Sequence, residues 1–258
     1  MIVLAFWVLS FLPTPAGGHG DRMLGATFKF FHPASTSTCF LMRHGEEEAL
    51  FLVTTAHTVE KTNGEKGTLV LRVPQEDGSY QRKDHEIPIR RGDDPLWVKH
   101  PQQDVAVLRL EEPLPVEVEA LSSEVLASEE ELRAAKVEVG TRLLVLTYPQ
   151  RFEANGAGFP VARQAVFASP PLLPSKTHPT FLADYTTFAG DSGGPVFMET
   201  EEGSGEPMIV GLVLAQHHHV DKMKSEYEER EIRYPLGMGT VLHARYILET
   251  LELAGKGN

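Results

Sequence analysis

Short apolar runs that alternate with turn residues make up most of the chain. In the first half these runs are separated by turn sequences such as Asn63-Gly64, and they cover residues 27–31, 39–42, 50–55, 67–73 and 105–110. In the second half they cover residues 141–148, 161–168, 180–185, 195–198, 208–214 and 237–242. Short strands at this spacing, bounded by Gly, Asn and Asp turns, predict an antiparallel all-β protein of the sandwich or barrel type.

Two segments show helical rather than strand patterns. Ser128 followed by Glu131 is a capping-box sequence just before residues 132–136, and it predicts a short helix there. Four apolar residues between 244 and 253 recur at helical spacing and predict a packed C-terminal helix. The charged stretch 221–233 has neither pattern, so we interpret it as a solvated loop or ribbon tip.

Composition limits the classes of molecule that the chain is expected to bind. The chain has 258 residues, 41% of them hydrophobic, which is enough for two small β domains with substantial cores. Its formal net charge of -12 argues against binding to a phosphate backbone, which depends on Lys and Arg, so we expect a protein or peptide substrate and no nucleic acid. Cys39 is the single cysteine, and no intramolecular disulfide can form.

The first residues leave the compartment open. Residues 1–12 are almost wholly apolar and are followed by Pro13 and small residues, as in a signal peptide, but no positive charge precedes them. Twelve residues are too few to span a bilayer, so we expect no stable membrane span. Residues 1–20 are interpreted as a signal peptide or a disordered N-terminus. The protein is secreted or periplasmic if residues 1–16 are a signal peptide, and otherwise cytoplasmic.

Three segments carry the residues that amide hydrolysis needs. An apolar run ends at His57 after two threonines and an alanine, Asp104 opens another apolar run, and Ser192 lies inside the turn Gly190-Asp191-Ser192-Gly193-Gly194. Glycines on both sides of a serine allow backbone angles that aim two N–H groups at one place. A nucleophile, a base, a group that orients the base and donors for an oxyanion are the four parts of acyl transfer by a serine enzyme.

These three segments, in this order, resemble those of the chymotrypsin-like (trypsin-like) serine peptidases, specifically the disulfide-free, largely bacterial branch. The resemblance covers roughly residues 26–253 and implies the chymotrypsin fold, which has two antiparallel six-stranded β-barrels and a C-terminal helix. We expect the first barrel in residues 21–115, with His57 and Asp104, and the second in residues 116–258, with Ser192 and the helix. The Pro-rich segment 111–115 is the expected connection.

The same resemblance assigns roles to individual residues. It implies that His57 is the general base, Asp104 the orienting acid and Ser192 the nucleophile of a serine endopeptidase, with backbone N–H groups of Gly190 and Ser192 as the oxyanion hole. It requires no cofactor and no metal. Asp191, whose counterpart in secreted animal members pairs with a new N-terminus after activation, must here be satisfied by another donor, because no activation sequence is visible.

A specificity pocket is also implied. Its base is expected at Thr186, and its walls at Leu214, Ala215 and Gln216 and around Gly237. Because Thr186 is neutral, a preference for Arg or Lys before the scissile bond is not supported. Gln216 stands where glycine is common in the family, which favours small or medium apolar side chains.

Three other interpretations compete with this one. A protease-like peptide-binding module that has lost activity could retain the same motifs. An α/β-hydrolase esterase would use Ser192 with Asp221 and His243, but its nucleophile needs a helix directly after it, and residues 195–198 are typical of a strand. The histidines at 217–219 could suggest zinc, but on a strand at most the first and third share a face, so a solvated loop is favoured over a metal site.

Overall fold

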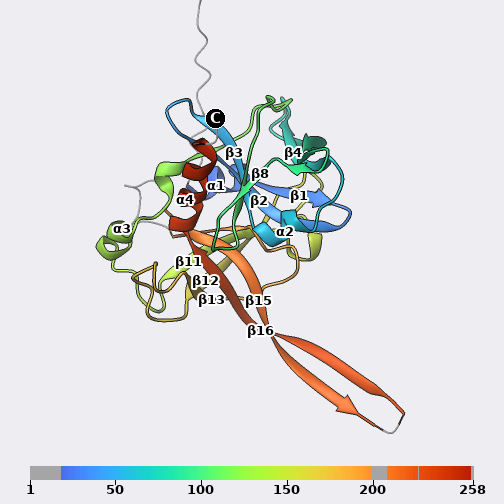
Figure 1. Ribbon diagram of the computed structural model, residues 1–258, viewed down its shortest axis with the longest axis vertical. Helices are drawn as coiled ribbons and strands as arrows, with labels where there is room; N and C mark the ends of the chain where they lie inside the picture. Colours follow the sequence, from blue (N-terminus) through green and yellow to red (C-terminus); the bar gives the residue numbers. More distant parts are fainter. Residues whose placement is uncertain (1–18, 199–207, 226, 257–258) are drawn as a thin grey trace, which may run out of the picture.

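The computed structural model describes residues 19–198, 208–225 and 227–256. Two β-sheets follow each other along the chain, with the helix α4 (Ala244–Gly255) at the end (Figure 1). The expected signal peptide or disordered N-terminus lies almost wholly outside the described residues, apart from the beginning of the helix α1 (His19–Ala26). Within the described ranges, no helix is long and apolar enough to cross a membrane.

The first sheet contains eight strands in the order β5-β4-β1-β2-β3-β9-β8, with β10 parallel to β2. Its strands are β1 (Thr27–His32), β2 (Ser35–His44), β3 (Ala49–Thr54), β4 (Lys66–Pro74), β5 (Tyr80–Pro88), β8 (Trp97–Lys99), β9 (Ala106–Arg109) and β10 (Leu121–Ser122). Two short strands, β6 (Arg90–Arg91) and β7 (Asp94–Pro95), form a separate ribbon, and the helix α2 (Ala56–Glu60) follows β3.

The second sheet is a closed six-stranded barrel in the order β11-β12-β13-β16-β15-β14. Its strands are β11 (Arg142–Thr147), β12 (Val161–Phe167), β13 (Thr180–Asp184), β14 (Pro195–Met198), β15 (Met208–Lys224) and β16 (Glu229–His243). The helix α3 (Glu129–Ala134) precedes the barrel, and Ser128 and Glu131 form both hydrogen bonds of a capping box there. The all-β prediction and both predicted helices are therefore confirmed.

The structure differs from the expected pair of closed barrels in the first sheet, which is open. Its end strands β5 and β8 do not pair with each other, and most of β5 is exposed to solvent. Strand β5 is therefore an exposed edge of the sheet, and the sheet does not close into a barrel. A second difference is the length of β15 and β16, which continue well past their predicted ends as a long hairpin (Figure 1). The charged segment 221–233 is the outer part of this hairpin, which agrees with the predicted ribbon and not with a loop.

One apolar core joins the two sheets. Phe40, Val53 and Val107 of the first sheet belong to the same buried cluster as Val145 and Phe197 of the barrel. The helix α4 also contacts both parts, packing on β8 and β9 as well as on β15. Because tight packing resists relative movement, the two sheets hold the groups between them at fixed separations.

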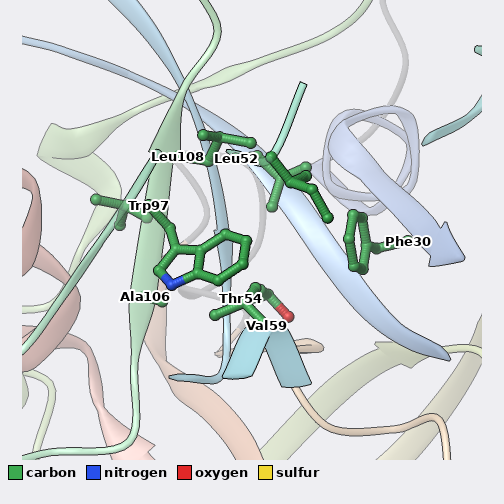
Figure 2. Close-up of a pocket in the computed structure, with 9 residues that line it drawn as sticks. Phe30, Leu52, Thr54, Val59, Trp97, Ala106 and Leu108 are labelled. Carbon is green, nitrogen blue, oxygen red and sulfur yellow. The ribbon is translucent and has the colours of Figure 1, made fainter. Parts of the chain in front are cut away.

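A second core fills the first sheet beneath the helix α2. Figure 2 shows the indole of Trp97 beside Leu52, Leu108 and Ala106, with Val59 of α2 and Phe30 facing the same space. The remaining cavity is only about 10 Å³, and Thr54 is its only polar lining residue. Such a space is too small and too apolar for a ligand. The side chains that line it pack against α2 and β9 and so support both elements.

The buried Arg72 connects three parts of the chain near this core. Its guanidinium lies 4.2 Å from the ring centroid of Phe28 and 4.7 Å from that of Phe159. It donates to the carbonyl oxygens of Leu24, Gly25, Thr27 and Gly158 and to the hydroxyl of Tyr148. Arg72 therefore ties the end of α1 and a loop of the second half to strand β4.

Replacing this side chain tests its contribution to stability. Arg72→Met is expected to lower the free energy of unfolding by at least about 2 kcal/mol, because several buried oxygens lose their donors. The matched control is Arg91→Met at an exposed position, with an expected change within about 0.5 kcal/mol. Urea unfolding measures both, and equal midpoints for the two variants would contradict the assignment.

Candidate active site

His57 lies at the start of α2, immediately after strand β3 ends. The hydroxyls of Thr55 and Thr58, on either side of it, form a hydrogen bond of 2.8 Å. Ala56, Thr58 and Val59 are buried. These buried side chains anchor α2 in the second core and leave the imidazole of His57 partly exposed in a cleft. The sequence predicted the end of the strand but gave no sign of the short helix.

Asp104 holds the histidine through two hydrogen bonds. One carboxylate oxygen accepts from the backbone N–H of His57 at 2.8 Å, and the other lies 2.6 Å from Nδ1 of the ring. Burial raises the pKa of Asp104, but the hydrogen bonds and charge of His57 outweigh this effect and hold the pKa below its usual value. Asp104 is thus ionised at neutral pH, and with Nδ1 donating to it, Nε2 of a neutral His57 is a proton acceptor.

The loop that carries Asp104 is held from the second half of the chain. His100 accepts hydrogen bonds at Nδ1 from the backbone N–H groups of Gln102 and Gln103, at 3.1 and 3.0 Å. Its Nε2 therefore carries the proton and donates to Glu249 of α4 at 3.2 Å. The C-terminal helix in this way fixes the loop directly before Asp104.

Ser192 lies between β13 and β14 and faces the same cleft. Its hydroxyl donates to the carbonyl oxygen of Leu214 at 3.0 Å. No hydrogen bond to Nε2 of His57 is present within the described residues, so that nitrogen is available in the cleft. To transfer its proton to His57, the hydroxyl has to leave its hydrogen bond with Leu214.

The peptide between Ala189 and Gly190 has a fixed orientation. The carbonyl oxygen of Ala189 accepts from the N–H of Gln150 at 2.6 Å. In a trans peptide the N–H points opposite to the carbonyl, so the N–H of Gly190 points away from Gln150. Across the described part of the chain, the N–H groups of Gly190 and Ser192 donate no hydrogen bond, which leaves both free for an incoming oxygen.

Gly190 and Gly193 are required by the backbone. Both have positive φ, at 98° and 85°. A Cβ on Gly190 would overlap the carbonyl oxygen of Tyr148, and one on Gly193 would overlap atoms of Thr38 and Thr54. The glycines thus permit both the turn around Ser192 and its close approach to the first sheet.

Thr38 of strand β2 joins the first sheet to this turn. Its backbone N–H donates to the carbonyl oxygen of Ser192 at 3.0 Å, and its hydroxyl donates to that of Gly190 at 2.8 Å. The same hydroxyl accepts from the backbone N–H of Tyr148 at 3.0 Å. One buried threonine therefore fixes the turn from the opposite sheet.

Asp191 is paired with an internal arginine. Arg163 of β12 donates to its carboxylate at 2.6 Å, and the N–H of Phe188 donates to the same oxygen at 2.8 Å. Burial raises the pKa of Asp191, and the Arg163 charge and hydrogen bond offset this only in part. Arg163 also donates to the carbonyl oxygen of Thr186 and the hydroxyl of Thr147, both at 2.6 Å. Asp191 thus has the other donor that the sequence required, without a new N-terminus.

The cleft has a volume of about 350 Å³ and brings together most of the predicted site residues. His57, Asp104, Gly190 and Ser192 line it, together with Leu214, Ala215 and Gln216. Thr186 and Gly237 are not among its lining residues: Thr186 contacts Arg163, and Gly237 lies between the paired residues Pro235 and Gly239 of β16. Thr187 and Phe188 line the cleft instead.

Two competing interpretations meet structural objections. In the esterase interpretation a helix would follow Ser192, but β14 follows it, His243 is buried beside Gly211, and Asp221 lies in the outer hairpin. The histidines at 217–219 lie in strand β15 rather than in the expected loop. Among the residues that the structure describes, no group of three or more His, Cys, Asp or Glu side chains is arranged to hold a metal ion.

Known proteins resemble this chain in fold and in sequence. The chain resembles the crystal structure of Rv3671c from M. tuberculosis H37Rv, an inactive serine-to-alanine mutant, with a TM-score of 0.52 and 18% identity over 100% of this chain and 98% of the other. A second structure of the Rv3671c protease, also in an inactive form, has a TM-score of 0.49 and 18% identity over 92% of each chain. No curated protein matches the sequence. The model of the trypsin-like peptidase domain matches residues 37–205, well over half of the chain, and the protein therefore belongs to the trypsin-like peptidase family.

Proposed function

We propose that the protein is a serine endopeptidase that cleaves peptide bonds through an acyl-enzyme, with Ser192, His57 and Asp104 as its catalytic residues. The observation that carries the proposal is the convergence of three features in one cleft. These are the doubly hydrogen-bonded His57–Asp104 pair, the Ser192 hydroxyl, and the two free N–H groups of Gly190 and Ser192. Family membership alone does not establish activity, because function depends on the site rather than on the fold.

Acylation follows from the positions of these groups. The Ser192 hydroxyl turns from Leu214 to Nε2 of His57 and transfers its proton there as Oγ bonds to the carbonyl carbon of the substrate. The carbonyl π electrons move to its oxygen, which the N–H groups of Gly190 and Ser192 stabilise. Asp104 accepts from Nδ1–H and stabilises the imidazolium. The C–N bond then breaks as His57 returns the proton to the leaving amine.

Deacylation uses the same groups in reverse roles. Water loses a proton to Nε2 of His57 as its oxygen attacks the acyl carbon, and the oxyanion again lies at Gly190 and Ser192. The ester bond to Oγ breaks, Oγ regains the proton from His57, and the carboxylic acid leaves. All bonds and protons balance without a cofactor.

Removal of the nucleophile tests the proposal most simply. A fluorophosphonate probe should label the wild type at Ser192 and leave Ser192→Ala unlabelled, and hydrolysis of an internally quenched peptide should fall by at least about 10³-fold in that variant. Peptides varied at the residue before the scissile bond are expected to favour small or medium apolar side chains. Equal labelling of both proteins would exclude the triad, and a profile dominated by Arg or Lys would exclude the proposed pocket.

The Thr38 hydroxyl offers a test of how the oxyanion groups are positioned. Thr38→Val keeps the volume and the backbone N–H but leaves the carbonyl of Gly190 and the N–H of Tyr148 unpaired. We expect kcat to fall about 10-fold or more, because misplaced oxyanion donors lose part of their stabilisation.

Thr38→Ser, which retains the hydroxyl, is the matched control and should keep kcat within about threefold of the wild type. Both variants are to be compared by thermal unfolding, so that a loss of kcat is measured on folded protein. Unchanged kcat in Thr38→Val would show that the hydroxyl does not position the turn.

A further inference from the structure

Strand β15 continues far beyond the barrel that contains its first residues. Its neighbour β14 pairs with it only as far as Leu212, whereas β16 pairs with it to the end, at Lys224 and Glu229. Figure 1 shows that the outer part of the β15–β16 hairpin projects away from both sheets. Within the described residues, the side of β15 opposite β16 has no strand partner from Leu214 to Lys224.

The two edges of this hairpin differ in their capacity to accept another strand. On β16 the outer edge contains Pro235, which has no N–H and interrupts any ladder. On β15 residues 214–224 contain no proline, so every second residue, whose backbone groups point away from β16, offers both an N–H and a C=O. Proteins commonly block exposed edges with proline, and here the block lies on β16 and not on β15.

The unblocked edge is continuous with the cleft. Leu214, Ala215 and Gln216 belong to β15, and they line the cleft beside Ser192. In the proposed function, the residue before the scissile bond fills the pocket along this wall. Leu214 contacts Ser192, so the scissile bond lies at this end of the wall. The substrate residues upstream of that bond then lie beside β15 residues of increasing number. The substrate then runs antiparallel to β15.

The outer hairpin also has one face with apolar groups. Cross-strand neighbours share a face, so His219, Asp221 and Met223 lie on the same side as Tyr234, Ile232 and Arg230. Met223 and Tyr234 are 60% and 48% exposed, which is high for such residues. The opposite face carries the ion pairs that Glu231 makes with Lys222 and Arg233. Alternate side chains of an added strand would therefore meet one face that includes exposed apolar groups and one face that carries ion pairs.

We propose that the free edge of β15 from Gln216 to Lys224 binds an extended, unfolded segment of the substrate polypeptide, upstream of the scissile bond, as an added antiparallel strand. The inference rests on the proposed peptidase function. Nine residues at about 3.3 Å each would guide roughly 30 Å of substrate into the cleft. Main-chain hydrogen bonds supply most of the affinity in this mode of binding, so long unfolded chains are favoured over short peptides.

Peptides of different length test the proposal on the full-length protein. Three internally quenched peptides share one scissile bond: a short one with four residues upstream, one with twelve upstream, and one with eight extra residues downstream instead. We expect kcat/KM for the upstream-extended peptide to exceed that for the short peptide at least 10-fold, mainly through KM. The downstream extension should change it less than threefold. Equal values for all three would overturn the inference.

A variant with a shortened β15–β16 hairpin tests whether the advantage of the upstream-extended peptide depends on this hairpin. Deletion of residues 221–232 joins Val220 to Arg233, which already face each other, through an added Asn-Gly turn. The deletion lies outside the cleft, so hydrolysis of the short peptide should be retained, while the advantage of the long peptide should fall to less than threefold. A retained 10-fold advantage would overturn the inference.

Backbone methylation of the long peptide tests the hydrogen bonding itself. In an antiparallel pair only every second residue donates towards its neighbour, so N-methyl groups at alternate upstream positions should raise KM at one set of positions and not at the other. Equal effects at both sets would show that the peptide does not bind as a strand.

These measurements separate the two proposals. Failure to hydrolyse any peptide would overturn the peptidase function and this inference with it. Hydrolysis without any dependence on upstream length would overturn only the role of the β15 edge. A wild-type dimer in light scattering that the deletion converts to monomer, without a length effect, would show that a second copy of the chain occupies the edge instead.

Discussion

The hydrogen bonds of Thr38 are the contact on which the arrangement of the cleft depends. The groups proposed for catalysis come from both sheets, with His57 and Asp104 on the first and Ser192 on the second. Thr38 donates from its backbone and its side chain to two carbonyl groups of the Ser192 turn. Gly193 permits this approach, because any Cβ there would overlap Thr38. Since the groups in the cleft must be held to fractions of an ångström, such a fixed contact between sheets is a precondition for the proposed chemistry.

Each proposed catalytic group is also supported by a separate internal contact. The pair of Arg163 and Asp191 holds the Ser192 turn from within the barrel, and Glu249 of α4 holds the loop before Asp104 through His100. Gln150 fixes the carbonyl of Ala189, and with it the direction of the Gly190 N–H. These contacts are made by residues of the same chain that lie far apart in sequence. The site is thus supported by contacts within the folded chain itself.

Much of the fold could be predicted from the sequence because buried strands repeat apolar residues with a clear spacing. The capping box at Ser128 and the helical spacing of α4 were equally direct signals. Strand β5 gave no such signal, because most of its side chains are exposed and carry polar groups. The length of the outer hairpin could not be predicted for the same reason, since its strands are held by their pairing with each other rather than by a buried face.

The supporting residues of the site were harder to predict than the proposed catalytic residues. Glycines around Ser192 and the spacing of His57 and Asp104 are visible in the sequence. Thr38 is one polar residue beside an apolar run, and its partner Gly190 lies 152 positions away. Arg163 is one of many charged residues, and only folding places it against Asp191 and Thr186. Thr186 and Gly237 were predicted from resemblance, and they lie outside the lining of the cleft.

The central claim is that contacts between the sheets place Ser192, His57 and the two N–H groups around one reacting carbon. A crystal structure of the wild type soaked with a peptide boronic acid, which forms a tetrahedral adduct resembling the transition state, tests it most directly. The account predicts a bond from Ser192 Oγ to boron, one boronate oxygen within hydrogen-bond distance of the N–H groups of Gly190 and Ser192, and His57 still paired with Asp104. An adduct whose oxygen points away from both N–H groups, or no adduct at Ser192, would contradict it.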